Sequence, residues 1–390
     1  MRKNHINKKV QKKLIIGITA EGSVNLLSGQ LAHFNSLGYK TYLLGPLSDR
    51  SAAFCENEGC EHLIIDIERE ISPIKDLKSL LSLIKIFRTI RPDIINLGTP
   101  KISLLGMVAG FTVGVKRRIY TCRGFRFEHE TGSRRKLLVI MEKITSACSH
   151  KIICISSSVL ELGIKNRIFD KSKAVVIHKG SSNGVNLNLF NPEKPSYSEV
   201  KERLIAKYKL HNSFIFGFLG RIVDRKGINE LLEVFDNIYS SHPEARLLIV
   251  GPFEMEQIKD KKLIQKIDSH PGIINYGKVP QEEVPGIMLS MDVFVLPAWW
   301  EGFGNVLIQA SAMGVPVIST NGTGTVDAVS DKFNGILIPV KDKEKLRNAM
   351  EKMMSDTDRR YEYGKNGKKW AQNFDRHLIW EGMDKIYREK

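Results

Sequence analysis

The sequence predicts an α/β protein with two doubly wound, Rossmann-like domains in series. Its 390 residues provide for about two domains of ordinary size. Short apolar runs bounded by Gly, Pro or Asn alternate with stretches of helical spacing, which is typical of parallel sheets built from β-α-β units. The alternation pauses at residues 191–197, NPEKPSY, where two prolines indicate a linker. We therefore expect domains over residues 1–192 and 193–370, followed by a terminal segment over residues 371–390.

The first half contains seven apolar runs with the length of buried strands. They cover residues 14–19, 41–44, 64–67, 94–97, 118–122, 151–155 and 174–178, with helical spacing at 28–37, 76–91 and 134–147. In the second half we expect strands at 214–219, 246–250, 273–276, 293–296, 315–319 and 335–339, and helices at 228–239, 305–312 and 346–354. Ligands bind beyond the carboxyl ends of the strands in such sheets, so we expect the two domains to face a common cleft.

No stretch of the sequence predicts a membrane-spanning helix. The longest weakly polar stretch, residues 102–115, is short of the ~20 apolar residues that a bilayer requires. The apolar run 14–20 follows a basic start but is closed by Glu21 without an A-x-A site, which favours a tail and a first strand over a signal peptide. Five cysteines without a C-x-x-C pair indicate a cytoplasmic protein with reduced thiols.

The net charge of +16 is concentrated in the first half of the chain. Residues 1–195 hold 31 basic and 16 acidic side chains, whereas residues 196–390 hold 28 and 27. The basic clusters are Lys8, Lys9, Lys12 and Lys13; Lys116, Arg117, Arg118, Arg123 and Arg126; and Arg134, Arg135 and Lys136. This asymmetry points to a partner with phosphates or anionic lipid that meets the first domain. The basic helix 76–91 either rests on lipid headgroups or presents a solvated face. Nucleic acid is not expected, because no nucleic-acid-binding motif accompanies the charge.

Two segments of the second domain have the composition of an anion site. In residues 296–329 a predicted strand leads through Glu301, Gly302 and Gly304 to a predicted helix, whose first N–H groups attract anions. Glu301 could accept hydrogen bonds from sugar hydroxyls, or it could simply cap the helix. In residues 216–227, Arg221 and Lys226 could together neutralise a diphosphate, although such a cluster alone could also be a surface turn.

Together, the two segments resemble motifs of the retaining glycosyltransferases of family 4, which have two facing Rossmann domains, the GT-B fold. The motif G-R-x-x-x-x-K-G is present from Gly220 and Arg221 to Lys226 and Gly227. The motif E-G-F-x-N-V-x-x-E-A begins at Glu301, but Gln309 stands at its second glutamate. The resemblance covers most of the chain, is strongest from residue 216 to 339, and implies that the terminal helix returns to the first domain.

The resemblance implies specific roles for several residues. Glu301, Arg221 and Lys226 would be catalytic, with Glu301 at the transferred sugar and the two cations at the departing diphosphate in place of a metal ion. Gln309 would face the ribose and Val279 the base. The donor-binding set implied in this way is Gly220, Val279, Gly302, Phe303, Gly304, Asn305, Val306 and Gln309.

The first half resembles a subgroup that builds bacterial surface polysaccharides and lipid-linked oligosaccharides. Gly22 and Ser23 replace the glycine-rich loop of many relatives and would lie where the donor phosphates meet the acceptor. Arg123 could clamp a diphosphate. His129 could orient a hydroxyl group, or it could be an ordinary loop histidine.

The implied function is metal-independent, cofactor-free transfer of a sugar, with retention, from a nucleotide sugar to a polyprenyl-diphosphate-linked sugar. The subgroup implies a uridine diphosphate N-acetylhexosamine as donor. The protein is expected to be cytoplasmic and peripheral on the inner face of the membrane, held by its basic first domain. Residues 180–190 resemble the family's interdomain loop G-x-D-x-x-x-F, with Asn186 at the position of the aspartate. Two alternatives remain: a noncatalytic binding subunit, favoured by Gln309 and Asn186, and a nucleotide-sugar 2-epimerase.

Overall fold

The chain folds into two compact units, each built on one parallel sheet. The structure, a computed structural model, describes residues 11–68 and 70–389, so Lys8 and Lys9 of the basic tail lie outside the described residues. One unit contains the described residues up to Ile155, Val159–Ile177 and the C-terminal segment from Trp380. The other contains Ser156–Ser158 and His178–Ile379. Below we call them unit 1 and unit 2.

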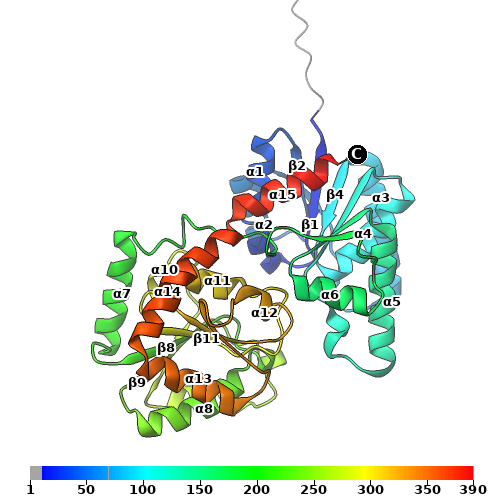
Figure 1. The fold of residues 1–390 in the computed structure, drawn as a ribbon. Helices are drawn as coiled ribbons and strands as arrows, with labels where there is room; N and C mark the ends of the chain where they lie inside the picture. Colours follow the sequence, from blue (N-terminus) through cyan, green and yellow to red (C-terminus); the bar gives the residue numbers. More distant parts are fainter. Residues whose placement is uncertain (1–10, 69, 390) are drawn as a thin grey trace, which may run out of the picture. The chain divides into compact units, whose positions relative to one another are not determined.

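Unit 1 contains a seven-stranded parallel sheet with the strand order β3-β2-β1-β4-β5-β6-β7 (Figure 1). Its strands are β1 Lys13–Gly17, β2 Lys40–Gly45, β3 Glu61–Ile64, β4 Ile94–Leu97, β5 Arg117–Cys122, β6 Lys151–Cys154 and β7 Ala174–Val176. The central strand β1 is paired with β2 on one side and β4 on the other. The strand order reverses at β1, which is the doubly wound arrangement predicted from the sequence.

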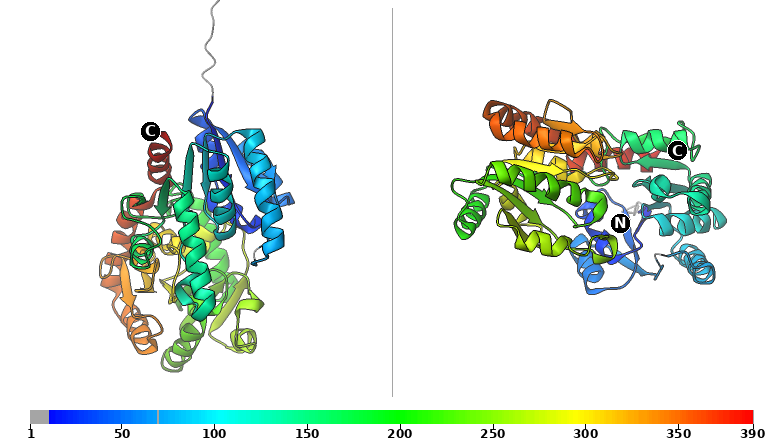
Figure 2. Two further views of the ribbon diagram at one scale, coloured as in Figure 1. Left: turned by 90° about the vertical axis from the view of Figure 1, so that its right-hand side faces the viewer. Right: turned by 90° about the horizontal axis from the view of Figure 1, so that it is seen from below.

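Helices cover both faces of this sheet (Figures 1 and 2). They are η1 Glu21–Leu27, α1 Gln30–Ser36, α2 Asp49–Glu58, α3 Pro73–Ile90, α4 Pro100–Thr112, η2 Arg126–His129, α5 Gly132–Cys148 and α6 Ser157–Lys165. Helix α4 packs against both α3 and α5. Its side chains Ile102 and Met107 are fully buried, so the apolar stretch noted in the sequence is a core helix. No helix in the described part of the chain is long and apolar enough to cross a membrane.

The last helix, α15 Arg376–Arg388, joins unit 1 from Trp380 onward. Tyr387 is buried there, and its hydroxyl accepts a hydrogen bond of 2.6 Å from the Asn96 amide on β4. The Tyr39 hydroxyl donates to the Asp384 carboxylate at 2.7 Å. The C-terminal helix therefore returns to the first domain, as the resemblance implied.

Unit 2 contains a six-stranded parallel sheet with the order β10-β9-β8-β11-β12-β13. Its strands are β8 Phe214–Leu219, β9 Ala245–Val250, β10 Ile273–Gly277, β11 Val293–Leu296, β12 Val317–Thr320 and β13 Gly335–Ile338. Its helices are α7 Pro195–Tyr208, η3 Asp224–Lys226, α8 Ile228–Ser241, η4 Met255–Gln257, α9 Leu263–Ser269, α10 Val284–Met288, α11 Asn305–Ala312, α12 Thr325–Ala328, α13 Lys343–Ser355, α14 Thr357–Ala371 and η5 Gln372–Phe374. Two Rossmann-like sheets confirm the predicted fold class.

Two local predictions were wrong. Helix α7 begins at Pro195, inside the predicted linker. A proline is favourable in the first helical turn, because backbone N–H groups there make no hydrogen bond within the helix and the missing N–H of proline costs none. Strand β3 ends at Ile64, where the predicted strand begins. The Ile65 N–H still donates to the Gly45 carbonyl of β2 at 2.9 Å, and both Ile65 and Ile67 are buried in the core. The apolar run therefore continues past the end of the strand into a buried connection.

Candidate functional site

The loop between β11 and α11 presents uncapped main-chain N–H groups. Helix α11 begins at Asn305, as predicted, and its N-cap is Gly304 in a left-handed conformation with φ of 85°, which supplies no side-chain acceptor. Phe303 is buried, and its ring centroid lies 5.2 Å from that of Phe374. This packing holds the loop in place. The first turn of α11 therefore has the main-chain geometry of an anion site.

Glu301 is held by two cations from a neighbouring loop. Its Oε1 atom lies 2.6 Å from Lys226 Nζ and 3.0 Å from Arg225 Nη1. Burial of Glu301 raises its pKa, but Lys226 and Arg225 outweigh that effect and lower the pKa below the ordinary glutamate value. The carboxylate is therefore ionised at neutral pH, and the alternative in which Glu301 only caps a helix does not describe its contacts.

The loop that carries both cations, η3, packs directly on the end of β11. Gly227 has a φ of 73°, and a Cβ atom there would lie 2.0 Å from the Pro297 carbonyl oxygen. Gly220 lies beside the amine, since an added Cβ would be 3.8 Å from Lys226 Nζ. The buried carboxylate of Asp224 accepts hydrogen bonds from Asn229 and from the Lys259 N–H, which anchors the loop. The structure thus brings Gly220, Lys226 and Glu301 together.

Arg221 has a different partner from the one we expected. Its Nη1 atom lies 2.9 Å and 2.8 Å from the two carboxylate oxygens of Glu254, and its side chain is 47% exposed. Lys226 and Arg225, not Arg221, contact Glu301. A diphosphate at Arg221 would therefore compete with Glu254.

Arg225 is the residue of this cluster that sequence reasoning missed. The family motif leaves its position variable, so only the guanidinium charge next to Lys226 could have indicated it. Its backbone carbonyl accepts the Trp299 N–H at 2.8 Å, which joins η3 to the segment that leads to Glu301.

The other donor-side residues lie on the same carboxyl edge of the sheet. Asn305 Oδ1 accepts a hydrogen bond of 2.8 Å from the Ser181 hydroxyl. Val306 and Gln309 are partly buried on α11, and Gln309 is one turn beyond Asn305 on the same helix face. Val279 is partly buried in the connection after β10, which is separated from β8 by β9. Gly302 is partly buried next to Glu301.

The acceptor-side candidates lie in unit 1, also beyond the carboxyl ends of strands. Arg123 follows β5, and an added Cβ at Gly98 would lie 3.1 Å from its Nε atom. Arg123 Nε and Nη1 are buried with no hydrogen-bond partner among the described residues, and burial lowers the Arg123 pKa to about 10.

The remaining acceptor-side candidates are more exposed. Gly22 is exposed in η1, and the Ser23 N–H donates to the Ala20 carbonyl. His129, at the end of η2, is 3.7 Å from Glu128. Among residues 11–68 and 70–389, no group of three or more His, Cys, Asp or Glu side chains could hold a metal ion.

Both halves of the chain match families of known proteins. Residues 22–187 match "Glycosyltransferase Family 4", and residues 200–370 match "Glycosyl transferases group 1". The chain is 33% identical over 377 residues to the capsular polysaccharide biosynthesis glycosyltransferase CapM of Staphylococcus aureus, with 96% of this chain and 97% of CapM covered.

A second relative and a solved structure extend the comparison. The Escherichia coli UDP-Gal:α-D-GlcNAc-diphosphoundecaprenol α-1,3-galactosyltransferase is 30% identical over 317 residues, which cover 80% of this chain and 78% of the relative. The crystal structure of HepE from Anabaena in complex with UDP-glucose has a TM-score of 0.79 at 19% identity, covering 96% of this chain and 98% of HepE. The likeness to HepE concerns the fold.

Proposed function

This chain belongs to the glycosyltransferases of family 4 and group 1, with the GT-B fold, and we propose that it transfers a sugar from a uridine diphosphate sugar to a polyprenyl-diphosphate-linked sugar with retention. The observation that carries this proposal is the contact of Lys226 with Glu301, beside Gly220 and the uncapped start of α11. This arrangement places a cation, a carboxylate and main-chain N–H groups around one small region.

Each of these groups has a part in the transfer. As the bond between the anomeric carbon and the diphosphate breaks, negative charge develops on the leaving group, and Lys226 with the α11 amides stabilises it. Glu301 accepts hydrogen bonds from hydroxyls of the transferred sugar. The acceptor hydroxyl oxygen forms the new bond to the anomeric carbon, its proton passes to the departing diphosphate oxygen, and UDP leaves. In this proposal the lysine takes the role of a divalent cation, so the reaction needs no metal or other cofactor.

The donor proposal is supported by the names of relatives. The Escherichia coli relative is named for UDP-Gal, and HepE binds UDP-glucose. We therefore propose a uridine nucleotide, and keep N-acetylhexosamine as the expected sugar. Val279, Gly302, Phe303, Asn305, Val306 and Gln309 would form the nucleotide and sugar contacts. Gln309 can still hydrogen-bond a ribose hydroxyl, since an amide both donates and accepts.

The acceptor proposal depends on Arg123. Its buried Nε and Nη1 atoms have no partner among the described residues, and burying such donors unpaired is costly. An acceptor diphosphate would supply the missing acceptor atoms and the compensating charge. The same relative from Escherichia coli is named for a diphosphoundecaprenol acceptor, which supports this assignment. Gly22, Ser23 and His129 would lie on the same side of the reaction.

We also propose that unit 1 binds the anionic inner face of the membrane. Apolar side chains recur at helical spacing on α3 and α5 and are between 41% and 74% exposed: Ile74, Leu77 and Leu81, and Leu137, Ile140 and Ile144. Exposed basic residues accompany them on the same two helices: Lys78, Lys85 and Arg88, and Arg134, Lys136 and Lys143. Apolar insertion combined with basic side chains is how amphipathic helices bind anionic lipid.

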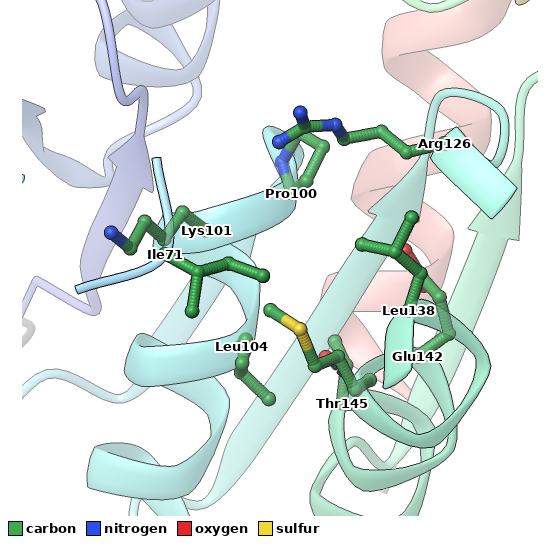
Figure 3. A pocket seen from close by; sticks show the side chains of 9 residues that line it. Ile71, Pro100, Lys101, Leu104, Arg126, Leu138, Glu142 and Thr145 are labelled. Atoms are coloured by element: carbon green, nitrogen blue, oxygen red, sulfur yellow. Dashed lines mark hydrogen bonds between the residues drawn. The ribbon is translucent and has the colours of Figure 1, made fainter. Parts of the chain in front are cut away.

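A pocket lies between α4 and α5, beside the segment that precedes α3. It is lined by the apolar side chains Ile71, Leu104, Leu138 and Met141 and by Arg126 (Figure 3). Leu104 is on α4, Leu138 and Met141 are on α5, and Ile71 belongs to the segment that precedes α3. Sedimentation with phosphatidylglycerol vesicles tests this face. Ile140→Glu should abolish co-sedimentation, whereas Tyr361→Glu on unit 2 should not. Equal binding by both variants would contradict the assignment.

The experiment that tests the transfer itself measures UDP release from a panel of nucleotide sugars, with and without polyprenyl diphosphate sugar. Release should need both substrates, and the anomeric configuration of the product, read by NMR, should match that of the donor. Glu301→Gln should abolish release, while Glu233→Gln, which alters an exposed ion pair with Lys343, should not. Donor binding without transfer to any acceptor would favour a binding subunit instead, and sugar epimerisation without an acceptor would favour an epimerase.

A further inference from the structure

We propose that Arg225 is a positioning residue that keeps the Glu301 carboxylate ionised and in place while Lys226 binds the donor diphosphate. This inference rests on the proposed function, because it assigns a role in the same site. Arg225 is adjacent to Lys226 in η3, and both cations contact the same oxygen, Glu301 Oε1.

Arg225 is held rigidly in this position. Its carbonyl accepts the Trp299 N–H at 2.8 Å, and its Nη1 atom donates to Glu301 Oε1 at 3.0 Å and to the Trp300 carbonyl at 3.4 Å. Its side chain is 21% exposed. A guanidinium has several donors in a fixed plane, so one end can bridge a carbonyl and a carboxylate at once.

The charges at the site explain why a second cation is needed. Without donor, two cations share one carboxylate. When the diphosphate binds, Lys226 must neutralise its charge. If Lys226 were the only cation in contact with Glu301, the carboxylate and the diphosphate would compete for the same ammonium group. Because Glu301 is largely buried, loss of the remaining cation in contact with it would favour protonation of the carboxylate, even though the charge of Arg221 also lowers its pKa. Arg225 provides a partner for Glu301 that the diphosphate does not engage.

This arrangement separates the two anionic groups of the donor complex. Lys226 turns toward the diphosphate, since an ammonium carries three donors and rotates freely. Glu301 stays attached to Arg225 and keeps its lone pairs toward the sugar hydroxyls. Arg225 itself contacts neither the sugar nor the phosphates, so it acts through Glu301.

The test compares Arg225→Met and Arg225→Lys in the full-length protein. Arg225→Met should bind free UDP within about threefold of the unsubstituted protein, because Lys226 remains, while kcat with the UDP-sugar falls about tenfold or more. Its acid limb in the pH profile of kcat/KM should move to higher pH by about one unit, because the pKa of Glu301 rises when a cation is removed. Arg225→Lys should have nearly the pH profile of the unsubstituted protein, because the charge is kept. Its kcat should stay lower, because lysine lacks the planar set of donors that positions Glu301.

A matched control is available in the same unit. Arg246, at the start of β9, also donates from Nη1 to main-chain carbonyls, those of Pro243 and Ala245, and to no carboxylate within residues 11–68 and 70–389. Arg246→Met should leave kcat and the pH profile unchanged. Thermal unfolding of each variant establishes that it is folded.

Three outcomes would overturn the inference. An equal fall in affinity for UDP and UDP-sugar in Arg225→Met would make Arg225 a diphosphate ligand. Unchanged kcat and an unchanged acid limb would make it a structural residue only, as would a lowered kcat with an unshifted acid limb. Absence of transfer in the unsubstituted protein would instead contradict the proposed function, and calorimetric binding of UDP and UDP-sugar would still measure whether Arg225 discriminates between them.

Discussion

Lys226 Nζ lies 2.6 Å from Glu301 Oε1, so the group assigned to the leaving diphosphate also holds the group assigned to the transferred sugar. Both side chains are at most 14% exposed, so their attraction is only partly screened by water. In the proposed reaction, donor binding would therefore redistribute the contacts of Lys226 between the diphosphate and Glu301.

Removing the lysine should act on the transition state more than on the fold. Lys226→Met should lower kcat by about 100- to 1000-fold, since the charge that develops on the diphosphate loses its stabilising cation. Single-turnover kinetics with saturating donor measure this step. Lys343→Met removes an exposed lysine paired with Glu233 and should leave kcat unchanged. A Lys226→Met enzyme with ordinary kcat and raised KM would show that the lysine only binds the ground state.

The ion pair between Arg221 and Glu254 is expected to affect the affinity for the donor. If Arg221 binds the diphosphate, Glu254→Gln should free it and tighten UDP binding, while Arg221→Ala should weaken UDP binding about tenfold. Stability should change by less than about 1 kcal/mol in each variant, because the pair is exposed. Isothermal titration calorimetry with UDP shows whether Arg221 binds the diphosphate. Unchanged affinity in both variants would mean that Arg221 is not part of the donor site.

Gly227 should tolerate no side chain. Gly227→Ala would place a Cβ atom 2.0 Å from the Pro297 carbonyl oxygen, in a backbone conformation that L-residues avoid, and should cost about 2 to 4 kcal/mol. Chemical denaturation measures this loss. For comparison, an added Cβ at Gly22 meets no atom within 4 Å, so Gly22→Ala should change stability by less than about 0.5 kcal/mol. Equal effects of the two substitutions would mean that η3 does not pack on β11.

Glu142 should make the stability of the protein fall with rising pH. Burial raises its pKa from 4.5 to about 7, although the hydrogen bond from the Tyr120 hydroxyl opposes the shift. The folded protein therefore holds a proton that the unfolded chain releases, and stability declines between the two pKa values and is constant above the higher one.

Replacing that carboxyl by a neutral amide should remove this pH dependence. Glu142→Gln should be more stable than the unsubstituted protein by about 2 to 3 kcal/mol at pH 8 and by almost nothing at pH 4. Urea denaturation at the two pH values measures the difference. A constant difference across this range would show that Glu142 titrates normally.

Much of the fold was predictable because strands buried on both faces leave an apolar signature. Strands β4, β8 and β11 have the predicted bounds, since apolar runs there coincide with sheet pairing. The apolar run does not match the strand at β3, because Ile65 and Ile67 are buried beyond the end of the strand at Ile64. It also fails at α7, because the prolines that indicated a linker include one that starts a helix.

The candidate site was predictable where a motif fixes the backbone. Gly304 and the start of α11 follow from glycine conformation and helix capping, and Lys226 and Glu301 were expected near each other. Side-chain choice among neighbouring cations was not predictable. Arg221 and Arg225 carry the same charge four residues apart, and only the fold shows that one reaches Glu254 and the other Glu301.

Sugar transfer is measured most directly by the mass of the acceptor after reaction. A polyprenyl diphosphate sugar incubated with the protein and a UDP-sugar should gain the mass of one sugar residue, with one UDP released per sugar gained. The gain should be absent in Lys226→Met and retained in Lys343→Met. An acceptor of unchanged mass with every UDP-sugar, while UDP still binds the protein, would contradict the account.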